Sequence, residues 1–200
     1  MRRSPIVTLV AGLVLGGVIT AWFAANRPAP KSAPAPKASA PSAAASPSAA
    51  ASSVLASATW AGEVDGGGVS IAIAVHDGVA VAYVCDGKRE AWLQGTAADG
   101  KITLTGKNGA SLTGTYSASG ATGSVTATGK QWTFTAGVVQ PPSGLYRTAQ
   151  FVNTAKVVCG WVVLPGNRQV GACSSEGQES TPAPTLNTAT AKPLDPKDYS

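Results

Sequence analysis

Three cysteines have the most distinctive chemistry in this 200-residue chain. Cys159 and Cys173 flank Pro165-Gly166-Asn167, and a hairpin that turns at this tripeptide places the two cysteines directly opposite each other. Directly opposed residues of antiparallel strands lie about 4.5–5.5 Å apart at Cα, which a disulfide can span. We therefore predict a Cys159–Cys173 disulfide. Cys85 is left over and is predicted to be a small buried hydrophobe.

The other reactive side chains form no catalytic or metal-binding pattern. His76 is the only histidine and lies in a predicted turn, with no serine nucleophile motif to partner it. A Cys/His metal site needs more ligands at close spacing. Asp77, Asp86 and Asp99 each precede a glycine, as turn residues do, and Gly129-Lys130 lacks the spacing of a phosphate loop. We predict no catalytic residue, cofactor or metal, and expect that the protein is not an enzyme.

The chain segment that must position these residues is rich in β-strand signals. Between Ala58 and Cys173, short apolar runs alternate with glycine-containing turns every eight to twelve residues or so. This pattern predicts an all-β domain over residues 58–173. We expect an antiparallel meander of about ten short strands that forms a small barrel or a sandwich, and the pattern does not decide between these two.

Turn chemistry and face matching predict the register of four hairpins. Residues that face each other across two strands share one face of the sheet, so we pair bulky side chains with bulky ones. The resulting pairs are Val75 with Val79 and Ile73 with Val81 around the three-residue loop 76–78, Leu104 with Leu112 around loop 107–109, Val125 with Phe134 around the two-residue turn 129–130, and Val162 with Val170 around loop 165–167.

Residues 1–26 are predicted to be an uncleaved signal anchor. Residues 6–25 carry no charge and are long enough to cross the ~30 Å hydrocarbon core as a helix. Arg2-Arg3 precede the run and favour a cytoplasmic N-terminus. The alternative is a cleaved signal peptide, but cleavage would place an aromatic residue such as Trp22 where a small one is preferred. We expect a single-pass protein of the cell membrane with its domain outside the cytoplasm, or a secreted one if the segment is cleaved.

Two segments are predicted to be disordered. Of the thirty residues 27–56, twenty-five are Ala, Pro or Ser, and such a segment cannot bury enough apolar surface to fold. We therefore assign residues 27–57 as a linker between the anchor and the β domain. Residues 174–200 are rich in Thr, Pro and Ala without apolar periodicity, and are predicted to be a disordered C-terminal tail.

The net charge of +5 belongs to the N-terminal part of the chain. Residues 1–56 contain five basic residues and no acidic one, whereas residues 57–176 contain eight basic and seven acidic residues, a net of +1. A nucleic-acid-binding domain normally concentrates basic charge on its folded part. The near-neutral net charge of the β domain therefore disfavours a nucleic-acid partner.

Several stretches of the β domain carry a family resemblance. They are His76-Asp77-Gly78, Tyr83–Lys88, Glu90–Leu93, Leu104–Gly106, Ser111–Gly114, Gly144–Arg147 and Gly160–Pro165. Together they resemble a family of uncharacterised actinobacterial proteins, secreted or membrane-anchored, with a domain of unknown function over residues 58–173. The resemblance implies a location outside the cytoplasm and carries over no activity and no functional residue.

The function that we expect is that of a membrane-tethered, non-enzymatic β module outside the cytoplasm. It would bind a cell-envelope protein or wall polymer. The alternative is a small-ligand-binding β-barrel that uses Trp60, Trp92, Trp132 and Trp161. These tryptophans can pack in the core of a small domain, or they can line a ligand cavity or an exposed interface.

Overall fold

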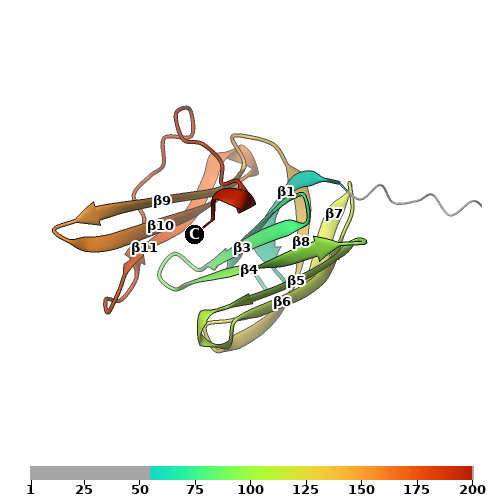
Figure 1. The fold of residues 1–200 in the computed structure, drawn as a ribbon, viewed down its shortest axis with the longest axis horizontal. Coiled ribbons are helices and arrows are strands. Elements are labelled where there is room, and N and C mark those ends of the chain that lie inside the picture. Colours follow the sequence, from blue (N-terminus) through green and yellow to red (C-terminus); the bar gives the residue numbers. More distant parts are fainter. Residues whose placement is uncertain (1–54, 200) are drawn as a thin grey trace, which may run out of the picture. The chain divides into compact units, whose positions relative to one another are not determined.

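A computed structural model describes residues 55–199 (Figure 1). The predicted anchor, with the proposed membrane span at residues 6–25, lies outside the described residues, as does nearly all of the predicted linker. Within residues 55–199, no helix is long and apolar enough to cross a membrane.

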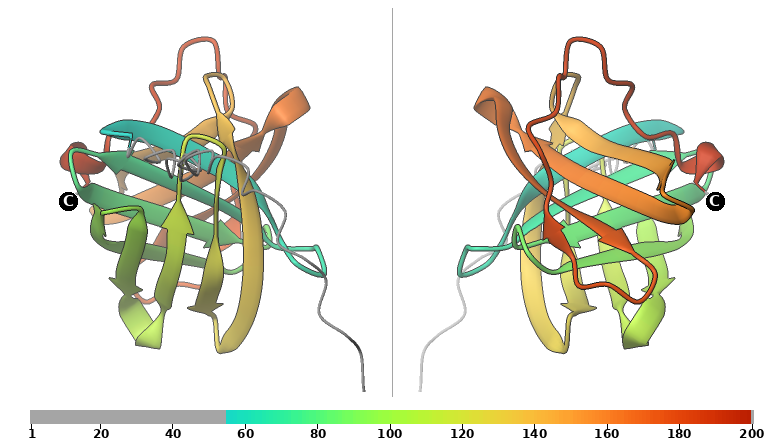
Figure 2. Two further views of the ribbon diagram at one scale, coloured as in Figure 1. Left: turned by 90° about the vertical axis from the view of Figure 1, so that its right-hand side faces the viewer. Right: turned by 90° about the vertical axis from the view of Figure 1, so that its left-hand side faces the viewer.

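Eight consecutive antiparallel strands form a closed barrel, in which the last strand pairs with the first. The barrel confirms the predicted all-β fold (Figures 1 and 2). Its strands are β1 (Ser57–Val64), β2 (Ser70–His76), β3 (Val79–Cys85), β4 (Glu90–Ala98), β5 (Lys101–Gly106), β6 (Ser111–Tyr116), β7 (Gly120–Ala127) and β8 (Lys130–Val139).

A separate four-stranded antiparallel sheet follows the barrel along the chain, in the order β12-β11-β10-β9. Its strands are β9 (Gly144–Val152), β10 (Ala155–Leu164), β11 (Arg168–Ser175) and β12 (Thr181–Pro182). Short 3-10 turns complete the described elements: η1 (Lys107–Gly109), η2 (Pro165–Asn167) and η3 (Pro196–Asp198). The strands are therefore divided between a barrel and a sheet, and do not form one meander.

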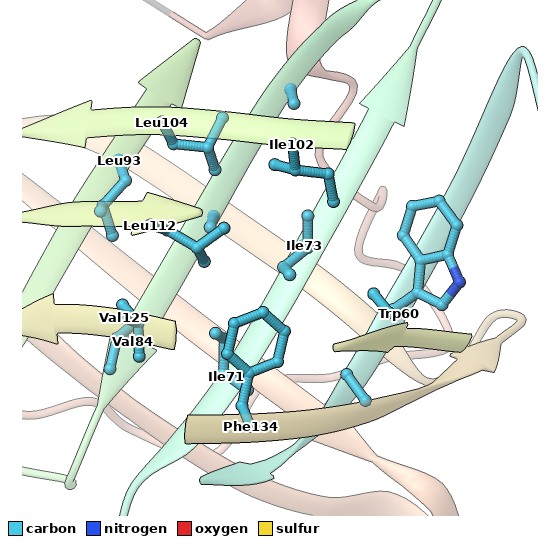
Figure 3. Close-up of a cluster of buried hydrophobic side chains, with 14 of the residues drawn as sticks. Trp60, Ile71, Ile73, Val84, Leu93, Ile102, Leu104, Leu112, Val125 and Phe134 are labelled. Carbon is cyan, nitrogen blue, oxygen red and sulfur yellow. The ribbon is translucent and has the colours of Figure 1, made fainter. Parts of the chain in front are cut away.

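Side chains fill the inside of the barrel (Figure 3). An eight-stranded barrel is just wide enough for side chains from all strands to meet at its centre. Trp60 is fully buried there, and its indole Nε1 donates a hydrogen bond to the backbone oxygen of Ser117 at 3.2 Å. Its largest partners in the cluster are Ile71, Ile73, Leu93, Ile102, Leu104, Leu112, Tyr116 and Phe134.

The outer faces of β2 and β3 are buried as well, because the four-stranded sheet packs against them (Figure 2). Tyr83 and Val81 on this outer face contact a second apolar cluster that includes Leu145 of β9 and Val162 of β10. Strands buried on both faces read as continuous apolar runs, as β2 and β3 do here.

The prediction that residues 174–200 are disordered is wrong for residues 174–199. They complete β11 and form β12 and η3. Ala183, Leu186 and Ala191 cover the outer face of the four-stranded sheet, where they pack against the cluster of Trp161. The Nε1 of Trp161 donates a hydrogen bond to the backbone oxygen of Pro184 at 2.8 Å. Single apolar residues of the segment are enough to cover this face. Their spacing has no period, so the amino-acid pattern does not predict an ordered segment.

The registers predicted around loops 107–109 and 165–167 are confirmed. Leu104 pairs with Leu112 and Val162 with Val170. Both loops are three residues long and contain residues in the left-handed conformation, such as Asn108 at φ 55°, which asparagine tolerates.

The register predicted around residues 76–78 is wrong by one residue. The turn contains only Asp77 and Gly78, with φ values of 46° and 82°, as in the two-residue turns that match strand twist. Ile73 consequently faces Ala82, where the prediction had paired it with Val81. Both faces of β2 and β3 are buried, so the pairing of bulky with bulky side chains no longer identifies one face. Large and small residues alternate across these strands instead.

The register predicted around residues 129–130 is wrong by two residues. The turn is Thr128-Gly129, with φ values of 48° and 77°, and Val125 faces Trp132 where the prediction had paired it with Phe134. A shift of two residues keeps every side chain on its predicted face, because side chains alternate with a period of two.

Candidate functional site

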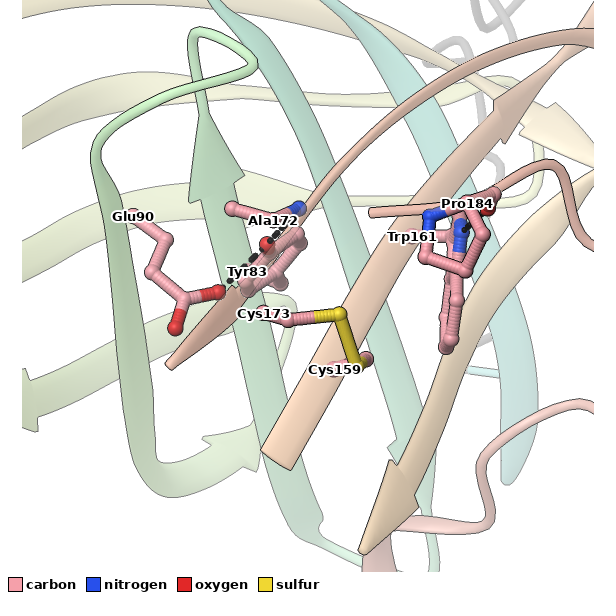
Figure 4. The surroundings of a disulfide bond; sticks show 7 residues. All are labelled: Tyr83, Glu90, Cys159, Trp161, Ala172, Cys173 and Pro184. Atoms are coloured by element: carbon pink, nitrogen blue, oxygen red, sulfur yellow. Dashed lines mark hydrogen bonds between the residues drawn. A yellow bond between two sulfur atoms is a disulfide. The ribbon is translucent and has the colours of Figure 1, made fainter. Parts of the chain in front are cut away.

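The predicted disulfide is present (Figure 4). Cys159 of β10 is bonded to Cys173 of β11, their Cα atoms are 4.0 Å apart, and the two residues pair directly in the ladder. Cys85 is free and buried, as predicted. Burial raises the pKa of the Cys85 thiol, and the backbone N–H of Gly87 donates a hydrogen bond to its sulfur at 3.2 Å. The thiol is therefore disfavoured as a nucleophile.

The four tryptophans do not gather in one place. Trp60 lies in the barrel core, and Trp161 lies under the C-terminal segment at 4% exposure. Trp132 is partly buried at the edge of the barrel core. Trp92 lines a hollow of about 930 Å³, whereas Trp161 lines a smaller one of about 310 Å³ beside the C-terminal segment.

This hollow, which we call the Trp92 cleft, lies between strands β4 and β5 of the barrel and strands β9 to β11 of the sheet. Its volume is about 930 Å³. A neighbouring hollow of about 530 Å³ shares most of its lining and adds Glu90. The main side chains of the cleft are the aromatic Trp92 and Tyr199, the cationic Lys107, Arg147 and Lys156, and the polar Gln94, Thr105, Ser174, Ser175 and Glu176.

Stacked aromatic rings form one wall of the cleft. The ring of Trp92 lies 4.3 Å from Tyr83 and 5.6 Å from Tyr199, measured between centroids. The guanidinium of Arg147 lies over the two partly buried rings of this stack, 4.9 Å from Tyr199 and 5.7 Å from Trp92. Such cation–π contacts stabilise each pair by about 0.5–1 kcal/mol at exposed sites.

Tyr83, the fully buried member of the stack, is held by two hydrogen bonds of its hydroxyl, which Figure 4 shows. Its hydroxyl donates a hydrogen bond to the Glu90 carboxylate at 2.6 Å and accepts one from the backbone N–H of Ala172 at 3.1 Å. Burial, followed by the charges nearby, raises the pKa of Tyr83 far above its ordinary value, so the hydroxyl stays protonated. Tyr83 thereby joins barrel strands β3 and β4 to sheet strand β11.

Gly160 of β10 allows the sheet to approach this stack closely. A Cβ at this position would lie 2.5 Å from Cζ2 of Trp92 and 2.7 Å from Cζ of Tyr83. Real carbon atoms do not approach so closely without displacement of one partner. A larger residue at position 160 would therefore push strand β10 away from the Trp92 ring.

The cleft carries charges of both signs. Lys107, Arg147 and Lys156 contribute positive charge, while Glu90 and Glu176 contribute negative charge. Such a lining offers hydrogen-bond donors and acceptors over its whole length. The described residues contain no group of three or more His, Cys, Asp or Glu side chains that could hold a metal ion.

Sequence reasoning identified Trp92 but missed Tyr83, Arg147 and Tyr199. Tyr83 lies in an apolar strand and looks like an ordinary core residue, while Tyr199 lies in the segment predicted to be disordered. Arg147 is the one charged residue within Gly144–Arg147, and no local pattern links it to Trp92. The comparisons with known proteins add nothing here, because no family model, curated protein or solved structure matches this chain.

Replacing Tyr83 with phenylalanine should lower the free energy of unfolding by about 1–3 kcal/mol, because the fully buried amide of Ala172 loses its hydrogen-bond partner. Tyr146→Phe is the matched control. The hydroxyl of Tyr146 donates only to the backbone oxygen of Pro142, an exposed residue, and its loss should cost about 0.5 kcal/mol. Urea unfolding of the full-length protein measures both, and equal losses would contradict the joining role of Tyr83.

Proposed function

We propose that this protein is a membrane-tethered β module that lies outside the cytoplasm and binds a polymer of the cell envelope in its Trp92 cleft. The proposed role is binding without catalysis. The observation that carries it is the cleft itself, in which the Trp92 stack lies beside polar and charged side chains.

A glycan-containing wall polymer suits such a lining. The flat apolar face of a sugar ring packs on an aromatic ring, while the hydroxyl, amide and carboxylate groups around its edge need hydrogen-bond partners. Gln94, Ser174 and Ser175 supply neutral partners, and Arg147 and Lys156 supply cationic ones. The charges of both signs favour a polymer that itself carries neutral and charged groups.

The proposed compartment has two supports. The Cys159–Cys173 disulfide is of the kind that persists in oxidising surroundings outside the cytoplasm. The uncharged run of residues 6–25, preceded by Arg2-Arg3, has the length and flanking charge of a membrane anchor. The linker of residues 27–57 would give the β module reach away from the membrane.

The alternative, a ligand cavity inside the barrel, has less support. Side chains fill the barrel interior, and Trp60 is fully buried among them. Trp132 borders only a hollow of about 10 Å³, and Trp161 is covered by the C-terminal segment. Of the hollows that a tryptophan lines, the Trp92 cleft at about 930 Å³ is larger than the one of about 310 Å³ beside Trp161, and so offers a small molecule more room.

Trp92→Ala should weaken binding to purified cell-wall peptidoglycan by roughly 30-fold or more, because a tryptophan at the centre of a binding site is worth 2 kcal/mol or more. Co-sedimentation of detergent-solubilised full-length protein with the insoluble polymer measures the affinity. Trp132→Ala is the matched control, since it removes a partly buried tryptophan outside the cleft.

We expect the Trp132→Ala protein to bind as the unmodified protein does. If Trp92→Ala binds equally well, the cleft is not the binding site. If neither the unmodified protein nor any variant sediments with the polymer, the proposed ligand is wrong.

A further inference from the structure

Residues 194–199, which we call the clasp, contribute one wall of the Trp92 cleft. They are the last residues that the structure describes. The clasp contains η3 and ends at Tyr199, whose ring stacks on Trp92. The other main parts of the cleft belong to the barrel and to the four-stranded sheet. Tyr199 is therefore the one aromatic wall of the cleft that sits outside both sheets.

Apolar packing and a few polar contacts hold the clasp: Leu194 and Tyr199 pack at the edge of the cluster between barrel and sheet, and Pro196 is buried. The backbone N–H of Leu194 donates a hydrogen bond to the oxygen of Leu145 at 2.8 Å. Nδ1 of His76 lies 2.8 Å from the Asp195 carboxylate, and Nζ of Lys197 lies 2.6 Å from the Asp77 carboxylate. Both polar pairs join the clasp to the turn region between β2 and β3.

The two polar pairs of the clasp are weak, and its apolar contacts come from three side chains, whereas each barrel strand is paired along its length on both sides. The side chains of His76 and Asp195 are each 32% exposed, and those of Lys197 and Asp77 are 46% and 57% exposed. Ion pairs with such exposure typically contribute 0.2–1 kcal/mol or less. A short segment held in this way can open locally while the strands stay paired, as low-stability segments of folded proteins do.

The ring of Tyr199 occupies space that a ligand ring would use. It lies against Trp92 and beneath the guanidinium of Arg147, and its half-buried position raises the pKa of its hydroxyl. Trp92 lies on β4, which pairs with β3, and Arg147 lies on β9, which pairs with β10, so both strands have partners outside the clasp. In the same closed arrangement, Nε1 of Trp92 is buried with no hydrogen-bond partner among the described residues, which costs free energy.

We propose that Tyr199 is a built-in occupant of the ring-binding position of the cleft, and that an incoming polymer ring displaces the clasp to stack on Trp92. This inference rests on the proposed function of the cleft. The apolar face of the sugar ring takes the stacking position on Trp92 that Tyr199 releases, and the hydroxyl or carboxylate groups of the sugar accept hydrogen bonds from the Arg147 guanidinium in place of its cation–π contact with Tyr199. The closed clasp thereby inhibits binding by the module itself. The apparent affinity equals the affinity of the open state multiplied by the fraction of molecules in which the clasp is open.

Two variants of the full-length protein test the clasp. Tyr199→Ala removes the occupant, and Asp195→Ala removes both the contact with His76 and the acceptor that caps η3 through the backbone N–H of Lys197. Tyr199→Ala should bind peptidoglycan about tenfold more tightly or more, since the open state of such an equilibrium is typically populated at 10% or below. Asp195→Ala should bind about two- to fivefold more tightly, because the loss of an exposed contact shifts the equilibrium by about that factor. Arg168→Ala is the control, because it breaks an ion pair with Glu63, which lines neither hollow.

Hydrogen exchange tests the clasp first without ligand and then with it. In Asp195→Ala, exchange should rise in peptides that cover residues 194–199 and stay unchanged in the barrel strands. In the unmodified protein, addition of soluble peptidoglycan fragments should raise exchange in the same peptides. Arg168→Ala should alter neither exchange in the clasp nor affinity.

The outcomes separate the two proposals. If Trp92→Ala abolishes binding while Tyr199→Ala and Asp195→Ala bind more weakly than the unmodified protein or equally well, Tyr199 belongs to the binding platform and the clasp inference is overturned, with the proposed function intact. If no protein binds, including Tyr199→Ala with its cleft unblocked, both proposals fall. Faster clasp exchange combined with tighter binding supports both.

Discussion

Replacing Trp60 with alanine should lower the free energy of unfolding by about 3–5 kcal/mol, the range observed when a buried aromatic side chain is truncated to a methyl group. Trp60 has 0% exposure at the centre of the barrel cluster. Its ring packs edge to face against Tyr116, with the ring centroids 5.3 Å apart. The substitution also removes the hydrogen bond that Nε1 of Trp60 donates to the backbone oxygen of Ser117. The strands cannot collapse fully into the resulting space because their pairing closes the barrel. Urea unfolding of the full-length protein, followed by circular dichroism, measures the loss.

Trp132→Ala is the matched control for this prediction. Trp132 lies in the same barrel but is only partly buried, on β8 next to the turn at Thr128-Gly129. Its loss should therefore cost clearly less than that of Trp60. A larger effect at Trp132 than at Trp60 would mean that the barrel interior is not packed around Trp60.

The second large effect is expected from the disulfide. Cys159→Ser should lower the free energy of unfolding by about 3 kcal/mol, the chain-entropy value for a closed loop of about fifteen residues. The two cysteines are separated by 14 positions in the chain. For a folded part of this size, the loss corresponds to a fall of roughly 10 °C in the melting temperature. Thermal unfolding of the oxidised full-length protein measures it.

Reductant supplies the control for the disulfide prediction. It should lower the melting temperature of the unmodified protein and of Cys85→Ala by similar amounts, because Cys85 is free. It should leave a variant that lacks both Cys159 and Cys173 unchanged. A crosslinked peptide that contains Cys85, found by non-reducing mapping, would contradict the pairing.

The proposed binding role depends on the junction between the barrel and the sheet. Trp92 comes from β4 and Arg147 from β9. Tyr83 is hydrogen-bonded to Glu90 within the barrel and joins the barrel to the sheet through the backbone N–H of Ala172. Gly160 permits the close approach of the layers at this point. A substitution that loosens the junction is therefore expected to weaken binding even where it does not touch the ligand.

The sequence by itself determined the features that depend on neighbouring strands and local turns. The all-β class follows from short apolar runs separated by glycine turns. The hairpins at 107–109 and 165–167 were predictable because their loop residues favour one loop length. The second of these hairpins also places Cys159 opposite Cys173, so the disulfide followed from local register alone.

Only the tertiary structure decided the features that depend on what packs against a strand from elsewhere in the chain. The outer faces of β2 and β3 are buried under a sheet far away in sequence, so face matching at residues 76–78 had no polar face to use and failed by one residue. The C-terminal segment is ordered because it packs on the apolar outer face of β10. The composition of the C-terminal segment alone does not indicate this contact. The Trp92 cleft joins Trp92, Arg147 and Tyr199, and residues so far apart come together only when the barrel closes and the sheet packs against it.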